Sequence, residues 1–272
     1  MSWSPLGPAL LFCPADRPDR FAKAAAAADM VILDLEDGVN ADDRVQARSA
    51  VIENLLDPQR TIIRVNPVDS PDFALDLETL EQTPYSIVML AKAESPEQVQ
   101  ALAGRSVIAL CETAKGVRES SSIATADSTI ALMWGAEDLL VSLGGRTSRN
   151  ADGGYRDVAR FARSQVLMSA RSRDRAAIDA IHLDIADVDG LRAEAEDAAA
   201  SGFCATACIH PTQVDVVRAA YRPTDDEVAW ASGVIRAAQG ERGVFRYEGR
   251  MVDAPLLRHA ERILANVGLS GN

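Results

Sequence analysis

Short apolar runs alternate with longer amphipathic segments along most of the chain. The runs are rich in β-branched or uniformly apolar residues, which is typical of parallel strands that are covered on both faces. We expect eight strands, at Ala9–Cys13, Met30–Leu35, Thr61–Val65, Ser86–Leu90, Val107–Cys111, Thr129–Trp134, Ala180–Asp184 and Ala205–Ile209. The alternation therefore predicts a series of β/α units.

The segments between the runs carry helix signals. Ser95 precedes Pro96, as an N-cap residue followed by a proline in the first helical turn. Gly202 closes another segment, at a position where glycine commonly ends a helix. We expect helices within residues 17–28, 41–56, 95–104 and 187–202.

Eight β/α units within residues 1–222 predict a (β/α)₈ barrel, the TIM-barrel fold, which typically has about 250 residues. A doubly wound sheet is the alternative, but it usually has fewer strands and a glycine-rich fingerprint after the first one. Residues 223–272 exceed what the barrel requires. They predict two more helices, within 224–239 and 254–267, joined by a polar hinge at 240–253. We expect this C-terminal extension to be a helical lid or an arm that reaches a neighbouring subunit.

Composition narrows the class of protein. The chain has 272 residues, 47% of them hydrophobic, which is enough for a large core. Its net charge of −12 disfavours nucleic acid and anionic membranes as partners, although a local basic pocket could hold a small anion. None of the four cysteines forms a CxxC pair, as expected in a reduced cytosol. With no basic leader and no apolar stretch near about 18 residues, we expect a soluble, cytoplasmic protein.

Charged residues stand where the predicted strands end. In a (β/α)₈ barrel the active site forms at the carboxyl ends of the strands and in the loops that follow them. Acidic residues after a strand can also cap the next helix, but packing does not explain charged groups at so many separate ends. The residues in question are Glu36, Asp37, Arg64, Lys92, Glu112 and Asp138.

Four of these residues are carboxylates, and they would repel one another in an empty pocket. A divalent cation removes that repulsion, and Mg²⁺ commonly takes one or two protein carboxylates, with water and substrate oxygens as its other ligands. We predict that Glu112 and Asp138 bind Mg²⁺ directly. Glu36 and Asp37 would then hydrogen-bond the water on the metal.

Arg64 and Lys92 supply positive charge to the same pocket. The Arg64 guanidinium suits bidentate recognition of a substrate carboxylate, and a salt bridge to Glu36 or Glu112 is the other interpretation. Lys92 could form a Schiff base, as in metal-free aldolases, but we expect it to hold Glu36 or Glu112 in place. A metal beside an arginine suggests a 2-oxo or 3-hydroxy acid substrate, whose carbonyl the metal would polarise.

Eight stretches fall in order across almost the whole chain: LFCPADRPDRFAKA, VILDLEDGV, RVNP, MLAKAES, CETAKGV, GAEDL, GFCATACIHPTQV and GRMVDAP. As an ordered set they resemble the citrate lyase β-subunit-like family, which includes malyl-, citramalyl- and other hydroxyacyl-CoA lyases. The chain departs from the family at Cys204–Thr206, where many relatives have an Asp-Gly-Lys sequence. That lysine could contact the phosphates of CoA, so its loss weakens the inference of thioester binding.

The resemblance implies a barrel, usually a homotrimer or a hexamer, that uses Mg²⁺ to cleave or form a carbon–carbon bond next to a thioester. The metal ligands of the family fall on Glu112 and Asp138, and its substrate-binding arginine falls on Arg64. Its catalytic aspartate falls on Asp253. In relatives the C-terminal segment reaches over a neighbouring subunit, so Asp253 would act in trans. The other interpretation of Asp253 is a helix N-cap before Pro255.

The predicted function is that of a Mg²⁺-dependent lyase. The substrate would be a 3-hydroxyacyl-CoA thioester, such as citryl-, citramalyl-, malyl- or hydroxymethylglutaryl-CoA, cleaved into a 2-oxo acid or related carbonyl product and an acyl-CoA. We expect substrate contacts from Arg64, Glu112, Asp37 and Lys92. The alternatives are a class II aldolase that acts on free 2-oxo acids, and a citrate lyase β subunit that acts on an acyl-carrier-protein thioester within a complex.

Overall fold

The chain divides into two compact units. The computed structural model describes residues 3–241 and 243–269. The first unit is Met1–Val217 and the second is Arg218–Asn272.

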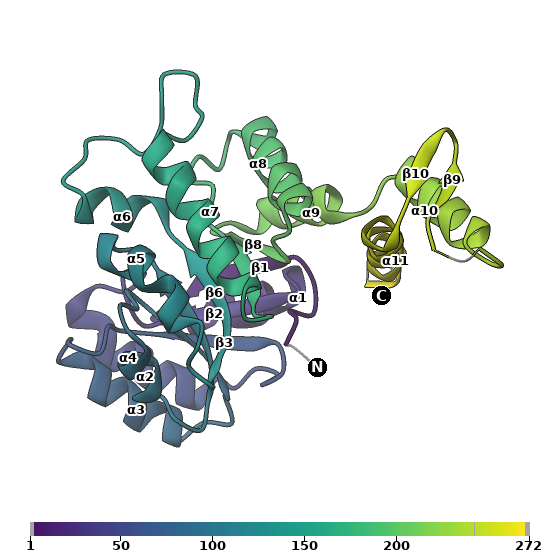
Figure 1. Cartoon of the computed structure of the whole chain (residues 1–272). Helices are drawn as coiled ribbons and strands as arrows, with labels where there is room; N and C mark the ends of the chain where they lie inside the picture. The colour runs from purple at the N-terminus through teal and green to yellow at the C-terminus, as the bar shows by residue number, and fades with distance from the viewer. Residues whose placement is uncertain (1–2, 242, 270–272) are drawn as a thin grey trace. The chain divides into compact units, whose positions relative to one another are not determined.

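The first unit contains a closed barrel of eight parallel strands (Figure 1). Each strand pairs with the next along the chain, and β8 pairs with β1 to close the barrel. The strands are β1 (Ala9–Pro14), β2 (Met30–Asp34), β3 (Thr61–Val65), β4 (Ile87–Leu90), β5 (Ser106–Cys111), β6 (Thr129–Trp134), β7 (Ala176–Asp179) and β8 (Ala205–Cys208). The predicted TIM-barrel fold is confirmed.

Helices and short 3₁₀ turns follow the strands (Figure 1). They are η1 (Pro18–Arg20), α1 (Phe21–Ala27), η2 (Ala41–Asp43), α2 (Arg44–Glu53), α3 (Asp72–Glu81), α4 (Pro96–Gln100), α5 (Ala114–Ile123), α6 (Ala136–Ser142), α7 (Asp157–Arg171), α8 (Val188–Ser201) and α9 (Pro211–Tyr221). The predicted start of α4 and the predicted end of α8 are confirmed. The Ser95 hydroxyl accepts the Gln98 N–H, and Gly202 follows α8 with a left-handed φ of 107°.

The position predicted for the seventh strand is wrong. The strand is β7, Ala176–Asp179, and the predicted segment Ala180–Asp184 is the loop that follows it. The predicted segment contains His182 and Asp184, whereas β7 is apolar except for its last residue, the buried Asp179. The barrel accepts this carboxylate because Trp134 and Arg163 donate hydrogen bonds to it from other elements. Those partners are 45 and 16 residues away, so local pattern did not reveal them.

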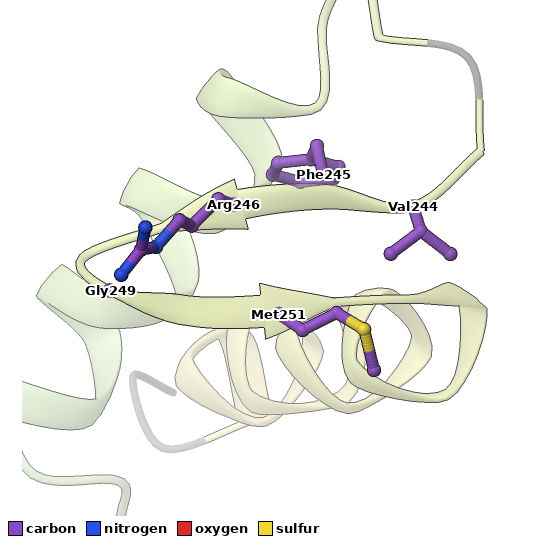
Figure 2. Close-up of a pocket in the computed structure, with 5 residues that line it drawn as sticks. All are labelled: Val244, Phe245, Arg246, Gly249 and Met251. Carbon is purple, nitrogen blue, oxygen red and sulfur yellow. The ribbon is translucent and has the colours of Figure 1, made fainter.

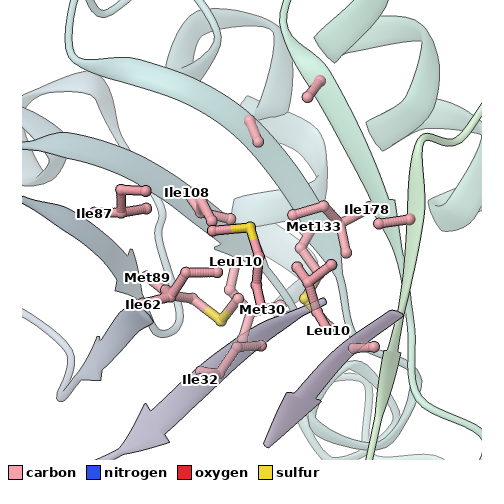
Figure 3. Close-up of a cluster of buried hydrophobic side chains, with 14 residues drawn as sticks. Leu10, Met30, Ile32, Ile62, Ile87, Met89, Ile108, Leu110, Met133 and Ile178 are labelled. Carbon is pink, nitrogen blue, oxygen red and sulfur yellow. The ribbon is translucent and has the colours of Figure 1, made fainter. Parts of the chain in front are cut away.

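The interior of the barrel is filled with apolar side chains (Figure 3). The labelled side chains come from seven of the eight strands and gather in the space that the strands enclose. They are Leu10, Met30, Ile32, Ile62, Ile87, Met89, Ile108, Leu110, Met133 and Ile178. This packed core makes the barrel a rigid support for the loops at its carboxyl end.

The second unit has its own small core. Helices α10 (Asp225–Ala237) and α11 (Ala254–Leu269) pack with an antiparallel hairpin of β9 (Phe245–Tyr247) and β10 (Arg250–Val252) around buried Ala231, Val234, Val252, Ala260 and Ile263.

The hairpin replaces the predicted hinge at 240–253, of which Arg242 lies outside the described residues. Its turn is made by Glu248 and Gly249, both at positive φ, as a two-residue hairpin turn requires. None of the helices described, in either unit, is long and apolar enough to cross a membrane.

The barrel core predicts a clear cost for removing one inward side chain. Ile62 is fully buried in this core, so Ile62→Ala should lower the free energy of unfolding by about 2–5 kcal/mol, measured by chemical denaturation. Leu55→Ala is the control, because Leu55 is 54% exposed and its loss should change stability by less than about 0.5 kcal/mol. Equal losses in the two variants would contradict the assignment of Ile62 to the core.

Candidate active site

A cavity of about 320 Å³ opens at the carboxyl ends of the barrel strands. Its charged lining consists of Asp34, Asp37, Arg64, Glu112, Glu137 and Asp138. Its large apolar lining consists of Phe12, Leu110, Met133, Trp134, Ile181 and Ile209. The cavity therefore brings together the predicted Glu112, which directly follows β5, Asp138 from α6 and Arg64 from β3.

Arg64 is held in a fixed orientation by a carboxylate of the neighbouring strand. Its Nε lies 2.7 Å from Asp34 Oδ1 and its Nη2 lies 2.6 Å from Asp34 Oδ2, a bidentate pair. Its guanidinium carbon is 5.0 Å from the centre of the Phe12 ring. Burial would lower the pKa of Arg64, but the charge and hydrogen bonds of Asp34 outweigh burial and raise it. Arg64 is thus a permanent cation whose plane is fixed at the edge of the cavity.

Asp34 is a functional residue that the sequence analysis missed. Each of its oxygens accepts two hydrogen bonds, because the N–H groups of Glu36 and Gly38 also donate to it, each at 2.9 Å. A side chain at Gly38 would begin 2.2 Å from Asp34 Oδ2, so the loop closes tightly around this carboxylate. The available signal was strand register, since Asp34 lies directly opposite Arg64 in the β2–β3 pair.

Lys92 ties three carboxylates together at the mouth. Its Nζ contacts Glu36, lies 2.8 Å from Asp37 and lies 3.2 Å from Asp138. Burial raises the pKa of Glu36 against the lowering effect of Arg64 and Lys92. Burial would also raise the pKa of Asp37, but the Lys92 hydrogen bond and charge hold it below its usual value.

Glu36 also faces Arg64. Its Oε2 lies 2.9 Å from Arg64 Nη1, although the pair is not aligned as a hydrogen bond. The salt bridges that the sequence analysis offered for Arg64 and Lys92 are both made to Glu36. Recognition of a substrate carboxylate by Arg64 stays a prediction.

Glu112 is a buried carboxyl group in a crowded position. It is 3% exposed, and its Oε1 accepts the backbone N–H of Lys92 at 3.1 Å. Burial, together with the negative charge of Asp138, raises the pKa of Glu112 to about 8. The carboxyl passes close to Gly135, where an added Cβ would lie 2.8 Å from Glu112 Oε2 and 3.0 Å from its Cβ. Gly135 therefore leaves the space that Glu112 occupies.

Asp138 stands in the first turn of α6 with 35% of its side chain exposed. Within residues 3–241 and 243–269, no group of three or more aspartate, glutamate, histidine or cysteine side chains is arranged to hold a metal ion. Glu112 and Asp138 offer a smaller set of two carboxylates. Such a set fits Mg²⁺, which keeps several waters and uses few protein ligands.

Asp253 belongs to the second unit, at the N-terminal end of α11. Its Oδ1 accepts the Leu256 N–H at 3.2 Å, and its backbone carbonyl accepts the Leu257 N–H at 3.0 Å. The N-cap interpretation of Asp253 is thus confirmed. Its catalytic role stays a prediction, which the cap does not exclude because one carboxylate can do both.

A second hollow, of about 430 Å³, lies on the hairpin of the second unit (Figure 2). Its lining is Val244, Phe245, Arg246, Gly249 and Met251. This lining contains no acidic side chain and a single cation, so it offers no acid–base pair. Of these two hollows, the barrel cavity is the one that combines acidic side chains with a cation.

The fold and the charged cavity together define a TIM-barrel enzyme whose site combines an acidic pair with a fixed arginine. A family model described as HpcH/HpaI aldolase/citrate lyase matches residues 9–211. The chain belongs to this family and is a carbon–carbon lyase.

Relatives of the chain cover nearly its full length. It is 58% identical over 262 residues, 96% of each chain, to the citrate lyase subunit beta-like protein of Mycobacterium tuberculosis. It is 30% identical over 287 residues, 93% of this chain and 83% of the relative, to the mitochondrial citramalyl-CoA lyase of Homo sapiens. A crystal structure of CitE from M. tuberculosis with magnesium, acetoacetate and coenzyme A matches with a TM-score of 0.93 and 58% identity, over 96% of this chain and 98% of that one.

The close approach of Gly135 and Glu112 gives a steric test of the site. Gly135 has ordinary extended backbone angles, φ −133° and ψ 132°, so alanine fits the backbone but pushes the Glu112 carboxyl aside. Gly135→Ala should lower kcat/KM roughly ten- to hundredfold, because a shift of about 1 Å in a reacting group costs that much. The melting temperature should change little.

The matched control for this test is Gly154→Ala. Gly154 is exposed, and its nearest neighbour to an added Cβ is Asp152 Oδ1 at 3.3 Å, away from the cavity lining. Full activity in Gly135→Ala would show that the position of Glu112 does not matter for turnover.

Proposed function

We propose that the protein is a Mg²⁺-dependent lyase of 3-hydroxyacyl-CoA thioesters, which releases an oxo acid or related carbonyl product and an acyl-CoA. One observation carries this proposal: the buried Glu112 lies beside Asp138, in a cavity that Arg64 also lines. The magnesium, acetoacetate and coenzyme A in the similar M. tuberculosis structure, and the name of the human relative, support the cofactor and the substrate class.

The residues of the cavity fit a divalent cation. A carboxyl group with a pKa of about 8 is mostly protonated at neutral pH, because burial and the charge of Asp138 disfavour its negative charge. Glu112 and Asp138 would both be ionised when they hold Mg²⁺. Among the described residues Asp138 has an ion pair with Lys92, whereas Glu112 has no ion pair with a cationic side chain. When bound, Mg²⁺ would polarise the carbonyl oxygen and stabilise the charge that develops as the carbon–carbon bond breaks.

Arg64 would orient the substrate. Asp34 fixes the guanidinium through Nε and Nη2, and Nη1 faces Glu36. Nη1 and Nη2 each carry a second hydrogen, so the same group can donate to a substrate carboxylate while it stays fixed. In the cleavage direction, the 3-hydroxyl group gives its proton to water and its carbon becomes a carbonyl, as the bond between that carbon and the carbon next to the thioester carbonyl breaks. The electron pair of this bond passes to the carbon next to the thioester carbonyl, where Asp253 would deliver a proton.

A metal titration tests the proposal most directly. Turnover of a panel of hydroxyacyl-CoA esters should require Mg²⁺, and it should stop in EDTA and return when Mg²⁺ is added. Glu112→Gln should lower this activity by roughly a hundredfold or more, since even outer groups at metal sites are worth 10- to 100-fold. Its control is Glu119→Gln, because Glu119 is exposed on α5.

Each other result points to a named alternative. Full activity in EDTA would refute the metal-dependent mechanism. Cleavage of free 2-oxo acids without any thioester would identify a class II aldolase. Turnover only of acyl-carrier-protein thioesters would identify a subunit that works within a complex, like a citrate lyase β subunit.

The role of Asp253 in trans, within a homotrimer or a hexamer, is part of this proposal and rests on the resemblance of the MVDAP stretch. Asp253→Asn and Glu112→Gln should each be inactive alone. Asparagine can still cap a helix, so Asp253→Asn should fold normally. If Asp253 acts on a neighbouring chain, mixing the two variants under exchange conditions should restore measurable activity. Mixed oligomers with no activity would place Asp253 in the site of its own chain, and full activity of Asp253→Asn alone would exclude it from catalysis.

A further inference from the structure

The apolar side of the cavity is built on loops. Ile181 follows β7 and Ile209 follows β8, and both line the cavity that contains Glu112 and Asp138. Both side chains are half-buried, so each contributes surface to the cavity. A wall built on two separate loops keeps a fixed width only if something ties the loops together.

Gln213 makes that tie. It is the third residue of α9 and is 2% exposed. Its Oε1 accepts the backbone N–H of Ile209 at 2.9 Å and that of His210 at 3.2 Å. Its Nε2 donates to the backbone carbonyl of His182 at 2.9 Å. One side chain thus bonds to Ile209 itself and to the residue directly after Ile181.

The hydrogen bond to His182 goes beyond helix capping. A glutamine or a glutamate at the third helical position often accepts the N–H at the start of the helix, and either residue can do so. A glutamate has no hydrogen to donate when it is ionised, so it could not bond to the His182 carbonyl. The other side of that loop is also fixed, because His182 is 5% exposed and its Nδ1 lies 2.8 Å from Glu194 Oε2. The bridge therefore joins two restrained segments.

We propose that Gln213 is a positioning residue that sets the separation of Ile181 and Ile209, and with it the width of the apolar wall that receives the carbon chain of the acyl thioester. This role rests on the proposed lyase function, because the charged half of the cavity would bind the oxo acid and the metal. Gln213 does not line the cavity, so it acts through the two isoleucines.

Two variants separate the bridge from the cap. Gln213→Glu keeps the acceptor for Ile209 and His210 but loses the donor to His182, whereas Gln213→Met loses both. Amide hydrogen exchange, followed by mass spectrometry, reads the two loops without any turnover. Gln213→Glu should speed exchange in residues 180–187 and leave 209–210 protected, and Gln213→Met should speed exchange in both segments. Unchanged exchange in 180–187 in both variants would overturn the bridge.

Kinetics then test the wall. With Mg²⁺, an oxo acid and acetyl-CoA or propionyl-CoA, condensation by Gln213→Glu should show a KM for the acyl-CoA raised about tenfold, while kcat stays within about threefold. The preference between the two acyl-CoA esters should also change. A fall in kcat at constant KM, or an unchanged preference, would overturn the proposal.

The control for both measurements is Gln98→Met. Gln98 Oε1 accepts the Glu94 N–H at 2.7 Å after β4, the same kind of loop contact, and neither residue lines the cavity. It should leave the KM for the acyl-CoA and the exchange of residues 180–187 as in the parent protein. A wild-type enzyme with no turnover of any acyl-CoA would refute the proposed function, and the exchange data would still decide whether Gln213 bridges the loops.

Discussion

Two cations pair with the crowded carboxylates at the mouth of the barrel. Arg64 pairs with Asp34 and faces Glu36, and Lys92 contacts Glu36, Asp37 and Asp138. Buried charges are tolerated only where partners compensate the loss of water, so removing either cation would leave carboxylates that repel one another. The rest of the site depends on this balance of charge.

Glu112 is the carboxyl group that this balance leaves out. The contact it receives from Lys92 is a backbone N–H, and no side-chain cation is paired with it among the described residues. Its pKa of about 8 reflects burial and the nearby charge of Asp138. The site therefore lacks a compensating positive charge next to Glu112 and Asp138, and carboxylates of this kind are typical magnesium ligands.

Two departures from ordinary backbone and side-chain preferences surround that position. Lys92 has a left-handed φ of 49°, a conformation that costs a non-glycine residue roughly 1 kcal/mol or more. This conformation belongs to a residue whose N–H reaches Glu112 while its ammonium group reaches the other carboxylates. Gly135 has no side chain, and this leaves room for the Glu112 carboxyl. Local costs of this kind are typical of functional sites, where geometry is favoured over stability.

The sequence determined the alternation of strands and helices, most strand positions and the charged residues at the strand ends. These features follow from local periodicity, and in a parallel barrel all strand ends meet at one mouth. The exception is β7, which lies at Ala176–Asp179 and not at the predicted Ala180–Asp184, and which ends in the buried carboxylate of Asp179. Only the tertiary structure brings Arg163 and Trp134 to that carboxylate.

The same reason explains why Asp34 and Gln213 had no visible role in the sequence. Asp34 needs Arg64, 30 residues away across a strand pair, and Gln213 needs His182, 31 residues away on another loop. Their partners are defined by strand register and by loop contacts, which depend on how the whole barrel closes. Local pattern therefore identified the charged groups of the site, and the fold alone decided which of them are paired, which is left unpaired and what holds the cavity walls in place.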